Sequence, residues 1–307
     1  MSQKLKEEYK ASLKSSDTEE NIDLAFYRPI GFMWACFFRK LGATPNFVTI
    51  LSIFLGVGAG ICMYPPVLWI NIIGMLLLVW ANSYDSADGQ LARLTKQYSP
   101  LGRILDGMAG DLWFVTIYIA ICLRSINTVP FFAGHTWVIW TLAASAGVCH
   151  ILQAAMADHY RQFHLLAVKG AAGSELDSTE ELKRKRDALS WGKDFFQKLI
   201  ATIYYAYTTV QEKVTPQMCR LRRELAKISP DGNIPPEIAA EIRKQSFPLC
   251  KWENFMTFNW RSIFLFVSLF VGMPWLYFVA ELTIFNIVLV YTVVTHERMC
   301  RRIADSL

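Results

Sequence analysis

Several acidic residues of this 307-residue chain lie in a short stretch directly beside long apolar runs. Asp85 and Asp88 are three residues apart, so on a helix they share one face. An ionised carboxylate in or beside hydrocarbon is costly unless it is paired, bound to metal or exposed to water. Two carboxylates this close repel each other unless a cation lies between them. Hard oxygen ligands beside small residues suit Mg²⁺ or Mn²⁺ bound to phosphates, so the stretch predicts a metal–pyrophosphate site.

Small residues and further carboxylates extend this stretch. Gly89 and Ala92 keep one helix face open, so that a pyrophosphate can approach the backbone closely. Arg93 either binds phosphate or balances the carboxylates, or it anchors the helix at the membrane surface. We predict that one or two metal ions, with two favoured, are bound by Asp85, Asp88, Asp106 and Asp111.

The pattern from Asp85 to Asp106, D-x2-D-G-x2-A-R-x8-G-x3-D, resembles the signature of the CDP-alcohol phosphotransferase family. The segment Leu41-Gly42-Ala43-Thr44-Pro45-Asn46-Phe47-Val48-Thr49 resembles the one that opens the first span of that family. The similarity covers roughly the first half of the chain, and the second half only by topology. It implies a membrane enzyme that transfers a phosphate-bearing group from a CDP-linked donor to an alcohol and releases CMP. It also implies a homodimer and a bound nucleotide, which we expect to contact Asp85, Gly89, Ala92, Arg93 and Gly102.

The chain departs from the family pattern at one position. The pattern ends in D-x3-D, which requires an Asp at position 110, but the chain has Gly110 followed by Asp111. In the family the last Asp resembles a general base for the acceptor hydroxyl. On a regular helix Asp111 would lie about 140° around the axis from Asp106, and a π-bulge would be needed to return it to that face. Three interpretations stay open: Asp111 is the catalytic base, another group is, or the chain is inactive.

Composition restricts the class of protein. The chain is 53% apolar and only 19% charged, and its apolar residues form long runs, so we expect one all-α integral membrane protein. The net charge of +5 suits anionic lipid headgroups, and no motif suggests nucleic acid. The seven cysteines show no paired spacing that would indicate disulfides or zinc. The charged residues 1–20 do not resemble a signal peptide.

Six transmembrane helices are expected from the apolar runs, the fifth being short and separated from the sixth at Pro274. They cover residues 47–65, 67–84, 101–123, 137–157, 261–273 and 274–295. Residues 22–41 predict an amphipathic helix in the membrane interface, or an ordinary amphipathic helix on a protein core. The expected organisation is a polar tail and interfacial helix (1–46), four spans with the motif (47–165), a cytoplasmic or interfacial helical insertion (166–256), and two spans with a basic tail (257–307).

Basic residues in the connections predict the orientation. They are concentrated between positions 93 and 103, after the fourth span and at the C-terminus, whereas the turns at Pro65-Pro66 and near Pro274 have none. By the positive-inside rule both termini and the acidic cluster face the cytoplasm, where a CDP-activated donor would be found.

Beyond the fourth span, Arg161 is the candidate for binding a phosphate or polar headgroup, or else an interfacial anchor. His150 is a core histidine or a spare base, and Glu281 makes a helix–helix hydrogen bond or contributes to a lipid groove. The apolar residues between Trp191 and Tyr207 recur at helical spacing, which predicts a helix that lies on the membrane, packs on a partner subunit or the core, or covers the site.

The favoured function is transfer of a substituted phosphate group from CDP-diacylglycerol to a polar alcohol, which is either phosphorylated or unphosphorylated. The close alternative is transfer of a headgroup phosphate from a donor such as CDP-ethanolamine or CDP-choline to diacylglycerol or ceramide. A membrane prenyltransferase also binds pyrophosphate through Asp clusters, but no second Asp-rich motif follows Asp158. An ion-coupled carrier would more often place its carboxylates in the middle of a span.

Overall fold

The structure is a computed structural model that describes residues 3–13, 17–170, 173–174, 176–229 and 234–307. Every regular element in these ranges is helical. The chain divides into two compact units. The first comprises residues 1–147 and 261–280, and the second comprises residues 148–260 and 281–307. The boundaries of the four segments expected from the sequence stay a prediction.

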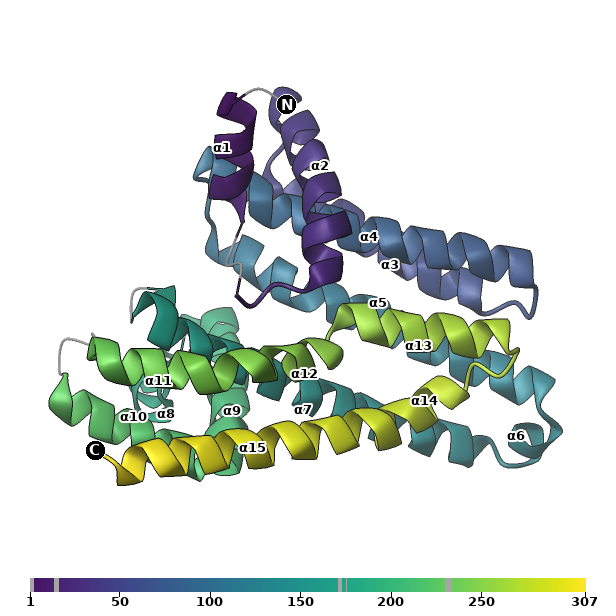
Figure 1. Cartoon of the computed structure of the whole chain (residues 1–307). Helices are drawn as coiled ribbons and strands as arrows, with labels where there is room; N and C mark the ends of the chain where they lie inside the picture. Colours follow the sequence, from purple (N-terminus) through teal and green to yellow (C-terminus); the bar gives the residue numbers. More distant parts are fainter. Residues whose placement is uncertain (1–2, 14–16, 171–172, 175, 230–233) are drawn as a thin grey trace. The chain divides into compact units, whose positions relative to one another are not determined.

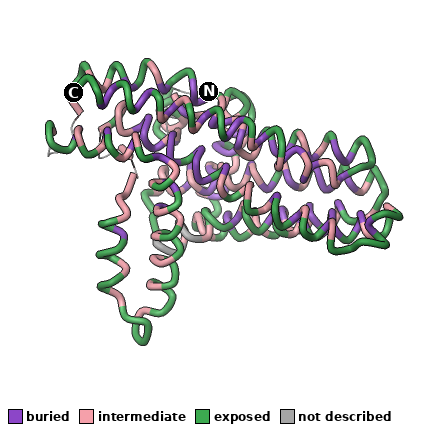
Figure 2. Tube along the Cα trace, turned by 90° about the horizontal axis from the view of Figure 1, so that it is seen from below, coloured by how far each residue is buried: buried purple, intermediate pink, exposed green. Residues whose placement is uncertain are grey.

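Three long helices form the centre of the first unit: α3 (Pro45–Met63), α4 (Leu68–Thr95) and α5 (Pro100–Thr128). Both α4 and α5 lie along α3 (Figure 1), and buried residues recur along the helices of the chain between exposed ones (Figure 2). Glycines on α3 allow the closest approach. A Cβ atom at Gly56 would lie 2.0 Å from Cδ1 of Trp113, and one at Gly60 would lie 3.0 Å from the backbone nitrogen of Ile117. Small residues four apart are a usual way for membrane helices to bring their backbones together.

The connection from α4 to α5 places the two halves of the acidic motif opposite each other. α4 ends at Lys96, whose φ of 56° is left-handed, and the chain then turns sharply. The Ser99 hydroxyl caps α5 by accepting a hydrogen bond from the backbone N–H of Gly102 at 2.9 Å. The last turns of α4 and the first turns of α5 are therefore neighbours.

An N-terminal helical segment packs on α4. It consists of a π-helical turn, η1 (Asp23–Tyr27), continued by α2 (Arg28–Lys40), which rests on α4 through Trp34, Trp80 and Tyr84. Helix α1 (Gln3–Ser12), within the expected polar tail, also contacts α4. The amphipathic helix expected near residues 22–41 is thus present as a helix, and its place in a membrane interface stays a prediction.

Three shorter helices complete the first unit: α6 (Pro130–Gly134), most of α13 (Phe258–Phe270) and α14 (Leu276–Ala280). The break expected at Pro274 lies between α13 and α14, where Gly272 has a left-handed φ of 76°.

Helices also make up the second unit. They are the greater part of α7 (Thr136–Lys169), α8 (Thr179–Asp187), α9 (Phe195–Val214), α10 (Pro216–Ile228), α11 (Pro236–Ser246), η3 (Phe247–Leu249), α12 (Cys250–Phe255), η4 (Glu281–Phe285) and α15 (Asn286–Asp305). Helix α10 packs on α15, where the Glu297 carboxylate accepts hydrogen bonds from the first N–H groups of α10 at 2.7 and 3.0 Å. The amphipathic helix expected near Trp191–Tyr207 corresponds to α9, on which Phe196 and Ile203 are exposed.

Five helical stretches in the described residues, rather than six, are long and apolar enough to cross a membrane. They are Pro45–Met63, Leu68–Thr95, Leu105–Thr128, Thr136–Lys169 and Leu276–Asp305. The expected fifth span corresponds to α13, whose 13 residues extend over only about 20 Å of the roughly 30 Å hydrocarbon core. The fourth span also differs from expectation, because α7 continues without a break from the apolar stretch as far as Lys169.

Candidate metal and nucleotide site

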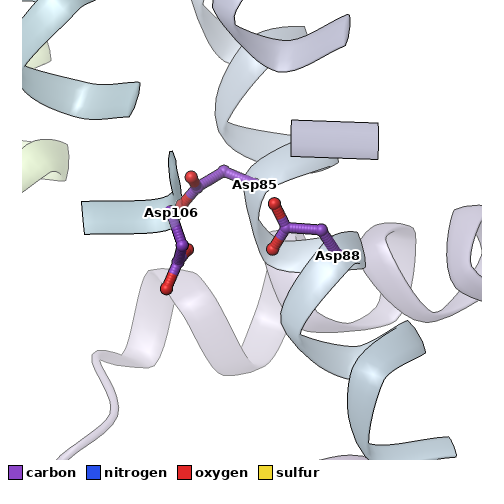
Figure 3. A group of neighbouring side chains, drawn as sticks. All are labelled: Asp85, Asp88 and Asp106. Atoms are coloured by element: carbon purple, nitrogen blue, oxygen red, sulfur yellow. The ribbon is translucent and has the colours of Figure 1, made fainter. Parts of the chain in front are cut away.

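Three carboxylates converge where α4 ends and α5 begins. Asp85 and Asp88 come from α4 and Asp106 comes from α5, and one oxygen of each lies within 4.8 Å of the other two (Figure 3). Asp88 is buried, Asp85 is half-buried and Asp106 is exposed, so the group extends from the packed interior of the first unit to its surface. The helical spacing that puts Asp85 and Asp88 on one face thus acts as the sequence predicts.

Helix α3 fixes the deepest of the three carboxylates. The buried hydroxyl of Thr49 donates a hydrogen bond to Oδ2 of Asp88. A neutral donor orients the carboxylate without cancelling its charge, so the negative charge of the group is kept. Asp88 still has its other oxygen for a further ligand.

A cavity of about 220 Å³ opens beside the carboxylates. Its lining is strongly polar and combines acidic, basic and uncharged side chains. It comprises Asp23, Tyr27, Arg28, Asn82, Asp85, Ser86, Gly89, Arg93 and Asp106. Burial raises the pKa of the Tyr27 phenol to about 12, so near neutral pH it is an uncharged hydroxyl. Carboxylates at one side and two guanidinium groups on the wall are the groups needed for a divalent cation and the phosphates that it bridges.

The donor set fits a hard divalent cation. All three groups offer carboxylate oxygens, which suit Mg²⁺ and Mn²⁺ better than softer metals. Oxygens that lie this close together repel when ionised, and a cation among them removes that repulsion. The geometry therefore supports Asp85, Asp88 and Asp106 as a metal-binding group, and Asp111 is not part of this group of described residues.

Comparison with known protein families supports a phosphate-transfer site at this position. Residues 42–171 match the family described as CDP-alcohol phosphatidyltransferase. This stretch is a CDP-alcohol phosphatidyltransferase domain. Members of the family transfer a phosphatidyl group from a CDP-alcohol in phospholipid synthesis and typically depend on a divalent metal. No curated protein and no solved structure matches the chain.

The matched domain contains the whole acidic motif and four of the five stretches that could span a membrane. Together with the fifth stretch, it indicates a multi-pass integral membrane protein of the phosphotransferase class. The match supports the function class predicted from the motif, whereas the donor, the acceptor and the homodimer stay predictions.

One of the three interpretations of Asp111 requires a π-bulge between Asp106 and Asp111, and α5 shows none there. Helix α5 is α-helical from Pro100 to Thr128, so Asp111 stays about 140° around the axis from Asp106. The π-helical turns in the described residues occur elsewhere, at η1 and η4. At the position where the family carries its last Asp, a Cβ atom on Gly110 would meet nothing within 4 Å. The helix therefore has room for the missing side chain but does not supply it.

The small residues of the motif fall into different surroundings. Gly89 lines the cavity, and Arg93 does so one turn further along α4. Ala92 is half-buried on the same face of α4. A Cβ atom at Gly102 would lie 2.4 Å from Oδ1 of Asn46, so Gly102 is also needed for the packing of α5 on the start of α3. Their contacts with a nucleotide stay a prediction.

Arg161 belongs to the second unit and lies on α7, where it is half-buried. It does not line the cavity of the first unit, and its role towards a headgroup stays a prediction. Nearby on the same helix, Nδ1 of His150 lies 3.5 Å from Oε1 of the fully buried Glu281. This pair connects α7 to η4, as expected for a contact between helices.

Reasoning from the sequence missed several residues of the site. Thr49 lies in the segment that resembles the first span of the family, but nothing in its spacing from the motif indicated a contact with Asp88. Arg28 is 57 residues before Asp85 and was interpreted only as a cation of an interfacial helix. Tyr27, Asn82 and Ser86 carry no motif at all. Asn82 and Ser86 lie on α4 itself, whereas Thr49, Tyr27 and Arg28 reach the site only because α3, η1 and α2 pack on α4.

Proposed function

We propose that the protein transfers a phosphatidyl group from CDP-diacylglycerol to a polar alcohol and releases CMP. The observation that carries the proposal is the group of Asp85, Asp88 and Asp106 beside a cavity that also contains two arginines, within a CDP-alcohol phosphatidyltransferase domain. The choice of CDP-diacylglycerol as donor rests on the polar and basic surroundings of Arg161, which suit a polar or phosphorylated acceptor.

In this proposal the three carboxylates hold Mg²⁺ or Mn²⁺, in one or two sites. When bound, the metal neutralises the pyrophosphate and makes CMP a better leaving group. Thr49 keeps Asp88 oriented, and Gly89 leaves space for the nucleotide at the surface of α4. Arg93, on the wall of the cavity, binds a phosphate oxygen. The acceptor hydroxyl attacks the phosphorus atom, the bond to the CMP oxygen breaks, and the hydroxyl proton goes to a base.

The general base that takes the proton of the acceptor hydroxyl is the step at which this chain departs from the family pattern. The family pattern supports an Asp at the position of Gly110, and Asp111 is the nearest carboxylate in sequence. Without a bulge in α5, Asp111 is on another face of the helix than Asp106. Asp111 as base and metal ligand therefore stays a prediction that mutation has to test.

The active site is proposed to face the cytoplasm, where nucleotide-linked donors are made, because the loops beside the motif carry the basic residues. A homodimer is proposed only on the resemblance to the family. Neither affects the chemistry of the site.

Transfer can be tested with purified protein in lipid nanodiscs and Mg²⁺, by measuring CMP release and the lipid product. One arm supplies CDP-diacylglycerol with an unphosphorylated polyol, a phosphorylated polyol or an amino alcohol. The other supplies CDP-ethanolamine with diacylglycerol. We expect turnover only in the first arm. Turnover only in the second would reverse the assignment of donor and acceptor, and none in either arm would contradict the proposed activity. Asp88→Asn protein, prepared in the same way, is the control for contaminating activity.

A further inference from the structure

Part of the cavity wall comes from outside the family domain. Asp23, Tyr27 and Arg28 belong to η1 and the first residue of α2, before residue 42, where the domain begins. Because all three residues lie before the matched domain, the family match assigns no role to them. Only Arg28 among the three carries a positive charge.

Arg28 is held firmly in this position. Its backbone carbonyl accepts a hydrogen bond from Nε2 of Gln90 at 3.1 Å, and its Nη1 donates to Oγ of Ser86 at 3.3 Å. One turn further along α2, Gly31 brings the two helices together, since a Cβ atom there would lie 2.8 Å from the same Ser86 oxygen. The close packing of α2 on α4 thus fixes the guanidinium beside the carboxylates.

The guanidinium is paired but still has donors for a ligand. Its Nε donates to Oε2 of Glu19 at 2.9 Å, and the two side chains are 18% and 5% exposed. Its Nη2 makes no hydrogen bond with any of the described residues. A guanidinium has five N–H donors arranged in a plane, which match the oxygens of a phosphate. Arg28 can therefore bind an anion in the cavity through its remaining donors, in competition with Glu19 for its charge.

Arg93 faces the same cavity from α4. Its Nε donates to the backbone carbonyl of Ser12 at 2.6 Å, so the N-terminal segment holds this guanidinium as well. Two guanidinium groups thus line the same cavity as carboxylates that suit a metal, and this combination suits a substrate anion. A divalent cation alone would leave part of the charge of two phosphates unbalanced.

The geometry points to an anion-binding subsite in which Arg28, supplied by the N-terminal segment, binds a phosphate group of the substrate. This inference rests on the proposed function for the identity of the substrate, but not for the presence of the subsite. The phosphate is either part of the pyrophosphate of the CDP-linked donor or the phosphate of a phosphorylated acceptor. The two sources can be separated by kinetics.

The test compares Arg28→Ala and Arg28→Lys with a matched control, Arg39→Ala. Arg39 is on the same helix and also pairs with an N-terminal glutamate, Glu8, at 2.9 Å, but it does not line the cavity. Binding of inorganic pyrophosphate in the presence of Mg²⁺ is measured by calorimetry on the full chain in nanodiscs. A charge-assisted hydrogen bond corresponds to about a 10- to 100-fold change in affinity. We expect Arg28→Ala to weaken binding in that range, Arg28→Lys to recover part of it, and Arg39→Ala to bind like the wild type.

Kinetics then identify the phosphate. A raised KM for CDP-diacylglycerol with every acceptor assigns Arg28 to the donor. A raised KM for the phosphorylated acceptor, without change for an unphosphorylated one, assigns it to the acceptor. Glu19→Gln provides a second variant that does not depend on the folding of Arg28→Ala. Because it removes a carboxylate that competes for Arg28, we expect it to bind pyrophosphate more tightly.

Equal affinity of the wild type and Arg28→Ala, or equal losses in Arg28→Ala and Arg39→Ala, would overturn the subsite. So would weaker binding in Glu19→Gln. If pyrophosphate binding depends on Arg28 but no CDP donor is turned over, the proposed function fails and the subsite stands. If turnover is normal and Arg28→Ala behaves as wild type, the function stands and the subsite fails.

Discussion

Buried or half-buried acids occur in both units of the protein, but in opposite surroundings. In the first unit Asp85, Asp88 and Asp106 lie next to one another beside a cavity. In the second, the fully buried Glu253 accepts a hydrogen bond from Nε2 of His296 at 2.9 Å. Glu281 lies near His150 in a similar way. An acid paired with a histidine has a partner that the fold supplies, whereas acids grouped with acids repel one another, and a bound cation would remove that repulsion.

The histidine pair also has a packing role. The ring of His296 stacks on Tyr160 with 4.0 Å between centroids and 9° between planes, which joins α15 to α7. The same chemical group, a carboxylate, thus contributes to packing in the second unit, whereas in the first unit we propose that it binds a ligand. The surroundings decide the role, and four predictions based on mutations and one based on metal removal follow from this comparison.

The largest expected effect is on the acidic group. Asp88→Asn keeps the shape of the side chain but removes a charge on which the metal depends, so we expect transfer to fall by about 10³-fold. Stability without metal should not fall, because a repulsion between carboxylates is removed. Turnover and thermal unfolding of the same preparation measure both. If the Asp88→Asn protein were less stable but fully active when folded, the acidic group would have a packing role, like the histidine pairs.

Removal of metal should have a similar effect without a mutation. We expect EDTA to reduce transfer to background and Mg²⁺ or Mn²⁺ to restore it. Since a ligand that binds only the folded state stabilises it by about 2.7 kcal/mol at 100 times its Kd, Mg²⁺ should also raise the unfolding temperature. The Asp88→Asn protein should lose this thermal shift. A shift of equal size in both proteins would show that the ion binds elsewhere.

The histidine pair should show the opposite result. His296→Ala removes the stack on Tyr160 and leaves the buried Glu253 without this partner, for which we expect a cost of about 3–5 kcal/mol in unfolding free energy. Turnover per folded molecule should change by less than tenfold. Unfolding curves and active-fraction titration separate the two quantities. If His296→Ala protein unfolded at the normal temperature but lost activity, the Glu253–His296 pair would have a role in the reaction and not in packing.

A smaller effect on stability is expected at the contact between α3 and α5, for which the same helix offers a matched control. Gly56→Ala places a methyl group against the indole of Trp113, and overpacking of this kind costs about 1–3 kcal/mol. Gly58→Ala on the same helix meets only Leu77, at 3.8 Å, and should be close to neutral. Comparing the two unfolding temperatures tests whether the α3–α5 contact holds Asp106 near the α4 carboxylates. Equal temperatures would contradict that contact.

The smallest effect is expected at Asp111. Because α5 turns this residue away from Asp106, we expect Asp111→Asn to reduce turnover by less than tenfold, whereas loss of a general base usually costs about 10²–10⁴-fold. Gly110→Asp restores the family spacing without a steric clash and should raise turnover. A loss of 10²-fold or more in Asp111→Asn would establish Asp111 as the base despite the regular helix.

Local sequence was sufficient for the helices and for the chemistry of the motif. Long apolar runs predict spans because backbone groups in hydrocarbon must be satisfied within a helix, and the spacing of Asp85 and Asp88 follows from the helical repeat. These features depend on neighbours in sequence. The length of a helix was harder to predict, since α7 continues to Lys169 and α13 stops after 13 residues, where the chain turns at Gly272.

Tertiary structure alone decided what surrounds the carboxylates. Thr49 reaches Asp88 from α3 and Arg28 reaches the cavity from α2, through contacts between residues 39 and more positions apart. The same holds for Glu253 and His296, whose pairing makes these polar groups part of the packing. The sequence by itself determined which segments are helices and where acids occur on them. Which acids face a cavity and which face a histidine depends on how helices pack, and no local rule specifies that.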